Sequence, residues 1–372
     1  MINRTKTFFR LLSSRKGEVR YYSTSFTKTD KYDEVQGINI SAYGGENPMG
    51  SIVFEGFLPR IQLYPGPSNH QKDIKIRFDL MKNIVDETLS QDTIQKSSNC
   101  LKAFLWPEFY FRPRFGAYTL EEAGELLEMI SQHFKRPGYS SCVFVAPFVA
   151  FDQSSGAKYS NVFNGAVVIE GGSDGDNLRL VPKPIMSDVD FKSGNFFIPK
   201  MLVPRIGLTK EEVLAMDVSS VPMHKMGLTR HHLTNGFVNV GNVNLAVEIC
   251  LAHRQGHLLS THKDKLAHIH MTPGAGLARM SEDPNTGDKS IDESFKEENL
   301  RLVDGGLAML TDFATSWNDL SPFQVAKKKT GQVLETLDAR TKVKISGGSG
   351  VYASDIISAH VYASMKLPKT TL

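Results

Sequence analysis

Short apolar runs alternate with helix-like stretches along most of the chain, and this alternation limits the possible folds more than any other feature. Residues 74–89 carry apolar side chains at helical spacing, and residues 100–106 then form a short apolar run. A second helix is predicted from residue 120, because Thr119 and Glu122 form a capping-box pattern ahead of further helical spacing. Strands that alternate with helices are typical of layered proteins. The sequence therefore predicts an α/β fold.

The other apolar runs predict further strands or buried segments, at 51–64, 142–149, 162–169, 178–181, 237–249, 266–271, 302–313, 341–345 and 350–352. After residue 271 we expect a turn at 273–276, the start of a short helix at 277–280 and a charged, solvated stretch at 281–298. Residues 185–235 differ, because Asp, Lys and Pro are frequent there and only 209–216 shows a helical pattern. We interpret residues 185–235 as an insertion or lid.

Composition and charge exclude several classes of protein. Of the 372 residues, 41% are apolar and 22% are charged, which is close to the average of folded domains and excludes collagen-like and disordered chains. The 43 Lys and Arg residues against 40 Asp and Glu give a net charge of +3, too small for the broad basic face of a nucleic-acid-binding protein. No stretch approaches the ~18 apolar residues of a membrane-spanning helix. Three cysteines without a Cys-x-x-Cys pair favour a reducing compartment.

The N-terminal segment has its own composition. Residues 1–29 contain seven Lys and Arg residues against one acid, Glu18, with many Ser and Thr. This is typical of an organellar transit peptide and equally of a disordered basic tail. We expect a basic segment over residues 1–35 and one large domain over 45–365. The expected location is the cytoplasm, with mitochondria as the alternative.

Three reactive residues each stand at or just past the end of an expected strand. They are Glu108 after 104–107, Lys183 after 180–182, and Cys250 after 244–249. Ligands of α/β enzymes bind at the carboxyl edge of the sheet. A thiolate can act as nucleophile, and a nearby Lys ammonium favours its formation. A carboxylate in reach can take the thiol proton, pass it to a leaving nitrogen and then activate water. We expect Lys183 and the backbone N–H of Leu251 to stabilise the oxyanion.

These segments resemble the nitrilase, or carbon–nitrogen hydrolase, superfamily, whose catalytic set is Glu, Lys and Cys in that order. The likeness rests on the Pro-Glu and aromatic residues of 105–111, the hairpin over 163–183 and the strand over 244–250. It continues through 268–274, 305–310 and 347–350, and covers roughly residues 50–365.

The resemblance implies a four-layer α-β-β-α sandwich and a thiol hydrolase that acts on a non-peptide C–N bond. It implies Glu108, Lys183 and Cys250 as the catalytic set, and an amide or nitrile as the small-molecule substrate. The chemistry requires neither a metal nor an organic cofactor. Relatives assemble through their sandwich faces, so the resemblance also implies a homo-oligomer.

The sequence departs from the family after the nucleophile. Residues 251–254 lack the Trp-Glu of many nitrile hydrolases and the Tyr-Asp common in amidases, so amidase and nitrile-hydrolysing activities both stay open. A catalytically silent relative that binds a metabolite or a protein is a further alternative. The second Glu that many relatives carry between Lys and Cys has four candidates here: Asp188, Asp190, Glu211 and Glu212.

Each catalytic candidate also has a simpler interpretation. Cys250 can be a small buried hydrophobic residue, like Cys100 and Cys142. Glu108 can form a salt bridge with a nearby Arg, at 112 or 114. Lys200 follows a Pro as Lys183 does, and is the alternative lysine. Glu248 lies two residues before Cys250, so a continuous strand places both on one face. We expect Glu248 to have a structural role.

The eleven histidines suggest two other chemistries. His253 follows Cys250 closely, but a Cys–His peptidase needs further partners that spacing does not identify. His231, His232, His268 and His270 are candidate metal ligands, yet no tight zinc motif such as His-Glu-x-x-His is present. We expect no metal site, and a polar pocket lining from residues 268 and 270.

Overall fold

The structure of the protein is a computed structural model. It describes residues 31–42, 70–113, 117–151, 162–173, 175–185, 222–274, 280–282, 289–291, 296–312, 325–331, 334–344 and 357–368. Several expected features lie outside the described residues: those of 1–30, the strands at 51–64 and 350–352, and the helix at 209–216. Of the expected insertion, residues 185 and 222–235 are described.

The larger of two β-sheets has the strand order β15-β16-β1-β2-β4-β5-β6, with β3 paired to β4. Its strands are β1 (Glu34–Ala42), β2 (Cys100–Leu105), β3 (Tyr118–Thr119), β4 (Cys142–Phe151), β5 (Val162–Glu170), β6 (Leu178–Pro182), β15 (Thr341–Lys344) and β16 (Ile357–Lys366). β2 and β4 are parallel, and β4, β5 and β6 are successively antiparallel. The carboxyl ends of β2, β4 and β6 therefore share one edge of this sheet.

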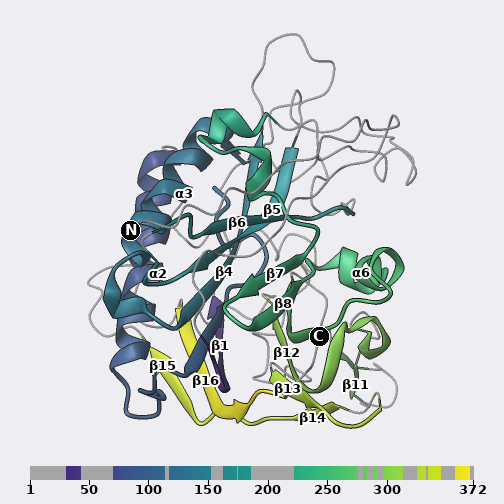
Figure 1. Ribbon diagram of the computed structural model, residues 1–372. Helices are drawn as coiled ribbons and strands as arrows, with labels where there is room; N and C mark the ends of the chain where they lie inside the picture. Colours follow the sequence, from purple (N-terminus) through teal and green to yellow (C-terminus); the bar gives the residue numbers. More distant parts are fainter. Residues whose placement is uncertain are drawn as a thin grey trace, which may run out of the picture.

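Two long helices cover one face of the larger sheet (Figure 1). They are α2 (His70–Ser90) and α3 (Leu120–Phe134), and both were predicted. The capping box of α3 is complete: Glu122 N–H donates to Thr119 Oγ1 at 3.1 Å, and Thr119 N–H donates to Glu122 Oε2 at 2.8 Å. These bonds satisfy donors that a helix start otherwise leaves open. Among the described residues, no helix is both long and apolar enough to cross a membrane.

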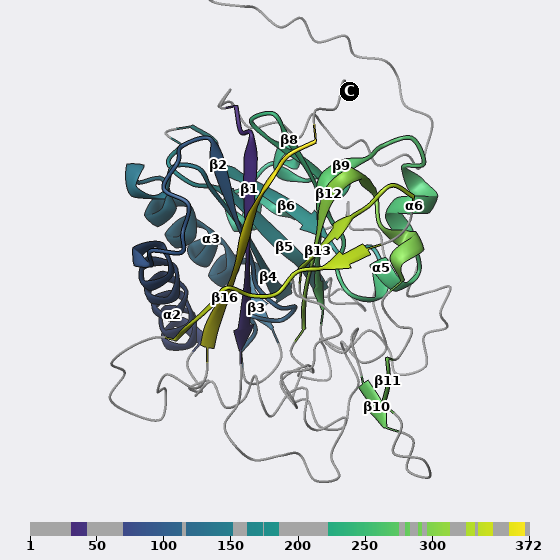
Figure 2. The same cartoon turned by 90° about the horizontal axis from the view of Figure 1, so that it is seen from below.

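A second sheet, with the strand order β14-β13-β12-β9-β8-β7, packs on the other face of the first (Figure 2). Its strands are β7 (Phe237–Val240), β8 (Val243–Val247), β9 (Ala267–Gly274), β12 (Leu302–Asp312), β13 (Val325–Lys328) and β14 (Leu334–Thr336). β8, β9 and β12 are parallel. Two short helices, α5 (Leu251–Arg254) and α6 (His257–Thr261), lie on its outer side. The other elements are η1 (Pro137–Tyr139), η3 (Met223–Met226), η4 (Arg230–His232), η5 (Glu297–Asn299), and the pair β10 (Met280–Glu282) and β11 (Lys289–Ile291).

The apolar core has two main parts, one on each face of the larger sheet. β2 shows why, because successive side chains of a strand point to opposite faces. Leu101, Ala103 and Leu105 join the core between the two sheets, together with side chains of β8 and β9. Phe104 joins the core beneath α2 and α3. The predicted α/β fold is thus observed, with its layers in the order helices, sheet, sheet and short helices (Figure 2).

Three strands of the larger sheet, β1, β16 and the two-residue β3, were not predicted. β1 lies between β16 and β2 and begins before residue 45, where we expected the domain to start. Its apolar pattern is interrupted by Gln36 and Asn39, which are buried. Gln36 Nε2 donates to the carbonyls of Thr93 and Tyr362, and Asn39 Nδ2 donates to Leu310 O. These long-range bonds give the buried side-chain N–H groups acceptors, and the local sequence does not predict them.

Two local expectations were wrong, and one expected apolar run is divided into two strands. β9 continues to Gly274, where we expected a turn from residue 273. Met280 begins strand β10, although residues 277–280 were expected to begin a short helix. The apolar run at 237–249 is a hairpin of β7 and β8 with a turn at Gly241, whose φ is 58°. Glycine adopts this left-handed conformation without steric cost.

Candidate active site

Glu108 lies shortly beyond the end of β2, where the two sheets meet. Its side chain is fully buried. Its backbone N–H donates to the carbonyl of Gly274, the last residue of β9 in the second sheet, at 3.2 Å. The next residue, Phe109, has a φ of 65°, in the left-handed region that non-glycine residues seldom adopt. The chain therefore turns sharply just after the carboxylate.

Lys183 directly follows β6 and forms a buried ion pair with Glu108. Lys183 Nζ lies 2.8 Å from Glu108 Oε1, and both side chains are 0% exposed. Lys183 N–H donates to Asn164 O at 2.8 Å, which extends the β5–β6 ladder beyond Pro182. The Asn164 side chain also donates from Nδ2 to Glu108 Oε1, at 3.0 Å. Two donors therefore hold the same carboxylate oxygen.

Burial makes this ion pair energetically demanding. Removing two charges from water costs several kcal/mol for each ion, and the attraction between them offsets this only when the geometry is good. The Lys183 ammonium also lies 5.9 Å from the centre of the Phe109 ring. A pair this deeply buried is weak evidence for stability, but it keeps a carboxylate and an ammonium at fixed positions.

Cys250 lies just beyond β8 and immediately before α5. Its φ of 48° and ψ of −113° place it in a strained backbone conformation for a residue with a side chain. Its N–H donates to Pro273 O at 3.0 Å. Cys250 is half-buried, whereas Cys100 and Cys142 are buried. Cys250 is therefore the least buried of the three cysteines.

β9 connects the cysteine with the ion pair. Two successive carbonyls at its end, Pro273 O and Gly274 O, accept the N–H groups of Cys250 and Glu108. Lys183 joins them through its contact with Glu108. The structure therefore brings the backbones at 108 and 250 to one strand end and the lysine side chain to the carboxylate.

Leu251 begins α5 directly after the cysteine. Within the described part of the chain, its N–H has no hydrogen-bond acceptor, as is usual for the first residues of a helix. The N–H groups of Arg254 and Gln255 donate to the carbonyls of Cys250 and Leu251, which fixes this turn. The donor that the sequence predicted for an oxyanion is thus directed away from its own helix.

The predicted shared face of Glu248 and Cys250 was wrong. Val247 and Ile249 belong to the core between the sheets, so alternation turns Glu248 to the outer side, toward α5 and α6. Cys250 instead packs against the core between the sheets. The strand ends at Val247 and the backbone then enters the left-handed region, which breaks the alternation.

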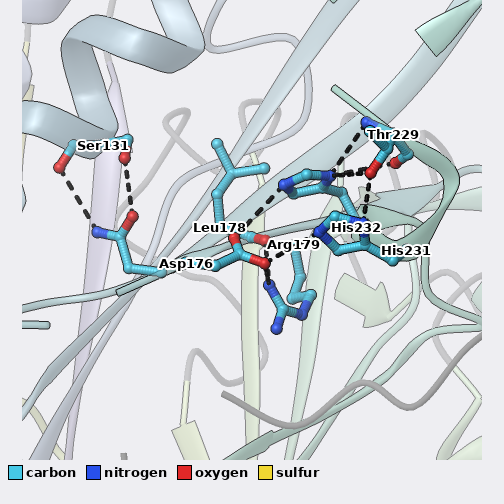
Figure 3. A network of polar contacts seen from close by, with 8 residues as sticks. Ser131, Asp176, Leu178, Arg179, Thr229, His231 and His232 are labelled. Atoms are coloured by element: carbon cyan, nitrogen blue, oxygen red, sulfur yellow. Dashed lines mark hydrogen bonds and ion pairs between the residues drawn. The ribbon is translucent and has the colours of Figure 1, made fainter. Parts of the chain in front are cut away.

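The hairpin that carries Asn164 and Lys183 is tied down at its turn (Figure 3). Asp176 Oδ2 lies 3.2 Å from His231 Nε2, and Asp176 Oδ1 lies 3.4 Å from His232 Nε2. Both histidine rings are also held through Nδ1 by Thr229. These contacts attach the β5–β6 turn to η4, and so they help to hold the hairpin that carries Lys183.

In the part of the chain that the structure describes, two groups of side chains place possible metal-binding atoms within 4.8 Å of one another: Asp176, His231 and His232, and Glu248, His253 and His270. In the first group, Arg179 Nη1 already lies 3.0 Å from Asp176 Oδ2 and supplies a positive charge. In the second, His270 Nδ1 accepts the N–H of Arg301 at 3.0 Å, which leaves the ring proton on Nε2, facing Glu248. A metal would need that nitrogen without its proton. The absence of a metal site stays a prediction.

Sequence reasoning missed Asn164 and the β9 carbonyls. Asn164 is a polar residue in an otherwise apolar strand, beside Gly165, and this was the available signal. Its contact with Glu108 depends on the β5–β6 register, which local sequence does not fix. Lys200, the alternative lysine, lies outside the described residues, as do Asp188, Asp190, Glu211 and Glu212.

Fold and site together define an α/β protein in which a carboxylate, an ammonium and a strained cysteine follow the carboxyl ends of β2, β6 and β8, in two sheets that pack on each other. No family model and no curated protein matches the sequence. Similar solved structures are a carbon–nitrogen hydrolase from Helicobacter pylori G27 (13% identity, 90% of each chain, TM-score 0.38) and Saccharomyces cerevisiae Nit3, a member of branch 10 of the nitrilase superfamily (12%, 90% of each chain, 0.37). An amidase of the nitrilase superfamily from Nesterenkonia AN1 is 11% identical over 91% of this chain and 92% of its own, with a TM-score of 0.35.

Proposed function

We propose that the protein is a carbon–nitrogen hydrolase of the amidase type, with Cys250 as nucleophile, Glu108 as general base and acid, and Lys183 as the oxyanion-stabilising cation. The observation that carries the proposal is the buried 2.8 Å ion pair of Lys183 and Glu108, whose carboxylate residue is bonded to the same strand end as the strained cysteine. A carboxylate, an ammonium and a thiol are the groups that a covalent hydrolase of this kind requires, and the proposal places the Cys250 thiol next to the buried ion pair.

The reaction begins when Glu108 takes the thiol proton and the Cys250 sulfur attacks the amide carbon. The developing oxyanion is stabilised by Lys183 Nζ and the Leu251 N–H. The C–N bond then breaks, Glu108 returns the proton to the leaving nitrogen, and a thioester remains on Cys250. Water activated by Glu108 attacks the thioester, which releases the carboxylic acid and restores the thiol. Each step uses groups of this chain, and none needs a cofactor.

The proposal also includes the class of substrate. The substrate is a small-molecule amide, with a nitrile as the alternative, because the thiolate can add to either carbon. A homo-oligomer and a cytoplasmic location, with mitochondria as the alternative, stay predictions.

The proposal is tested by ammonia release from a panel of primary amides and matching nitriles. We expect turnover of amides, and Cys250→Ser should lower it by at least about a thousandfold, since oxygen is the poorer nucleophile here. Cys142→Ser serves as the matched control and should keep its activity. Turnover of nitriles alone would establish the alternative substrate.

Alkylation of the thiols gives a test that needs no known substrate. Cys250 should react with iodoacetamide far faster than the two buried cysteines, because the thiolate is the reacting form. Burial raises the pKa of Cys100 from 9.0 to about 11, so this thiol is a slow internal reference. Equal native-state labelling of all three cysteines, together with no turnover of any panel compound, would support a catalytically silent protein.

A further inference from the structure

A buried carboxylate lies behind the cysteine, on the outer side of the second sheet. Glu248 Oε1 accepts the N–H of Leu258, at the start of α6, at 2.7 Å. Glu248 Oε2 lies 3.1 Å from His253 Nδ1 on α5 and 3.5 Å from His270 Nε2 on β9. Glu248, His253 and His270 are at most 2% exposed. We call Glu248, His253, His270 and the backbone N–H of Leu258 the Glu248 anchor.

The protonation of the Glu248 anchor follows from its contacts. The Arg301 N–H donates to His270 Nδ1 at 3.0 Å, so the proton of a neutral His270 ring is on Nε2 and faces the carboxylate. Burial by itself would raise the pKa of Glu248, but His253 and His270 outweigh burial and lower this pKa from 4.5 to about 2. Glu248 is therefore a charged acceptor at neutral pH, surrounded by N–H groups from three different elements.

These contacts fix the short segment that carries the nucleophile. Residues 250–258 contain Cys250, the Leu251 N–H, α5 and the start of α6. The Glu248 anchor holds this segment through His253 and through Leu258. From the other side, Asn299 Nδ2 donates to His253 O at 2.7 Å. Gly256, with a φ of 63°, leaves space for Asn299, because a Cβ there would lie 2.7 Å from Asn299 Oδ1.

We propose that Glu248 is a positioning residue of the hydrolase, which acts through His253 and Leu258 to hold Cys250 and the Leu251 N–H in the strained conformation that the reaction uses. This inference rests on the proposed function. Glu248 itself lies on the opposite side of the sheet from the core that Cys250 contacts. The strain at Cys250 persists only if the surrounding structure enforces it, and the Glu248 anchor is what fastens the residues that follow.

The titratable groups around Glu248 come from every element packed on it. They are His253 of α5, His257 of α6 and His270 of β9. Burial lowers the pKa of His257 and of His270, so both rings are neutral at pH 7. At pH 7 the charged group of the anchor is thus Glu248, next to the neutral rings of His257 and His270. The pH profile of alkylation is read from the Cys250 thiol itself.

The test measures iodoacetamide alkylation of Cys250 by mass spectrometry between pH 6 and 9. In Glu248→Gln, the segment loses its attachment, and the thiol leaves the position near Lys183 that the proposed function assigns to it. We therefore expect alkylation at pH 7 to slow by about tenfold and its pH midpoint to rise by about one unit. His268→Gln is the matched control. His268 Nδ1 also accepts a backbone N–H, from Asn244 at 3.0 Å, on the same strand as His270. This control should stay within twofold of the unmodified protein.

A second pair of variants keeps the test decisive if Glu248→Gln does not fold. His253→Asn retains a donor near the position of Nδ1 and should keep most of the alkylation rate, whereas His253→Leu should lose it. A rate and midpoint unchanged in Glu248→Gln, or a midpoint that moves down as loss of a negative charge alone would cause, would overturn the inference. Slow alkylation of Cys250 in the unmodified protein would instead contradict the proposed function.

Discussion

The Lys183–Glu108 pair is the residue-scale feature on which the site depends. Both charges are fully buried, and Asn164 supports the same carboxylate oxygen. Such a pair stabilises the fold little in itself, yet removing one partner leaves the other charge buried without compensation. Removing both charges should therefore restore stability, but it cannot restore activity if the pair is catalytic. This difference distinguishes a catalytic pair from a purely structural one.

We predict that Lys183→Met abolishes amide turnover and lowers the free energy of unfolding by about 3–5 kcal/mol, because Glu108 is left as an uncompensated buried charge. The double variant with Glu108→Gln as well should recover most of that stability and none of the turnover. Urea unfolding and ammonia release measure the two quantities.

The alternative lysine supplies the control for this experiment. Lys200→Ala should change neither quantity appreciably. Full turnover by Lys183→Met, combined with loss of turnover by Lys200→Ala, would transfer the catalytic role to Lys200.

At the scale of elements, the β5–β6 hairpin decides whether the lysine reaches the carboxylate. Gly165 follows Asn164 and pairs with Pro182, directly before Lys183. A Cβ at Gly165 would lie 2.5 Å from the Phe163 ring and 2.7 Å from Val181 O, which is backbone of the paired strand. This glycine therefore permits the close approach of β5 and β6.

We predict that Gly165→Ala separates the two strands near the site and lowers both stability and turnover, with a loss of about 1–3 kcal/mol typical of overpacking. Gly138→Ala is the matched control, because a Cβ there meets no atom within 4 Å. Thermal unfolding and ammonia release should distinguish the two. Equal effects of both substitutions would show that the close approach at Gly165 does not matter.

The elements also show what local sequence can predict. α3 was predicted from Thr119 and Glu122, because a capping box is a contact between residues three apart. β1 was missed because Gln36 and Asn39 find their partners far along the chain. The candidates for the site follow from strand ends and can be found from sequence. The role of Asn164 and the strain at position 250 depend on strand register and on β9, which only the folded chain defines.

For the whole molecule, burial of histidines links stability to pH. Burial lowers the pKa of six histidines below the ordinary 6.5: His133, His232, His257, His262, His268 and His270. The unfolded chain therefore binds protons at a higher pH than the folded chain does. Stability from these groups is fully present above pH 6.5 and is lost as the pH falls below it.

Glu248 adds a second window of acid sensitivity. Because its pKa is lowered from 4.5 to about 2, its contribution is present above pH 4.5 and is lost as the pH falls toward 2. The two windows have the same sign, so acid destabilises the protein progressively. A change of 1 kcal/mol moves the unfolding temperature by about 2–4 °C in domains of 150–250 residues.

We predict that the thermal unfolding temperature decreases as the pH is lowered from 7.5 to 5.5 at constant ionic strength. Over this range the histidines begin to take up protons in the unfolded chain. Glu248→Gln should unfold at a lower temperature than the unmodified protein at pH 7, and the difference should shrink as the pH falls from 4.5 toward 2, where Glu248 itself is protonated. Calorimetry over this pH range measures both effects. A midpoint independent of pH above 5.5 would show that the buried histidines titrate alike in the folded and unfolded chains, and a constant difference below pH 4.5 would show that the Glu248 charge contributes nothing to folding.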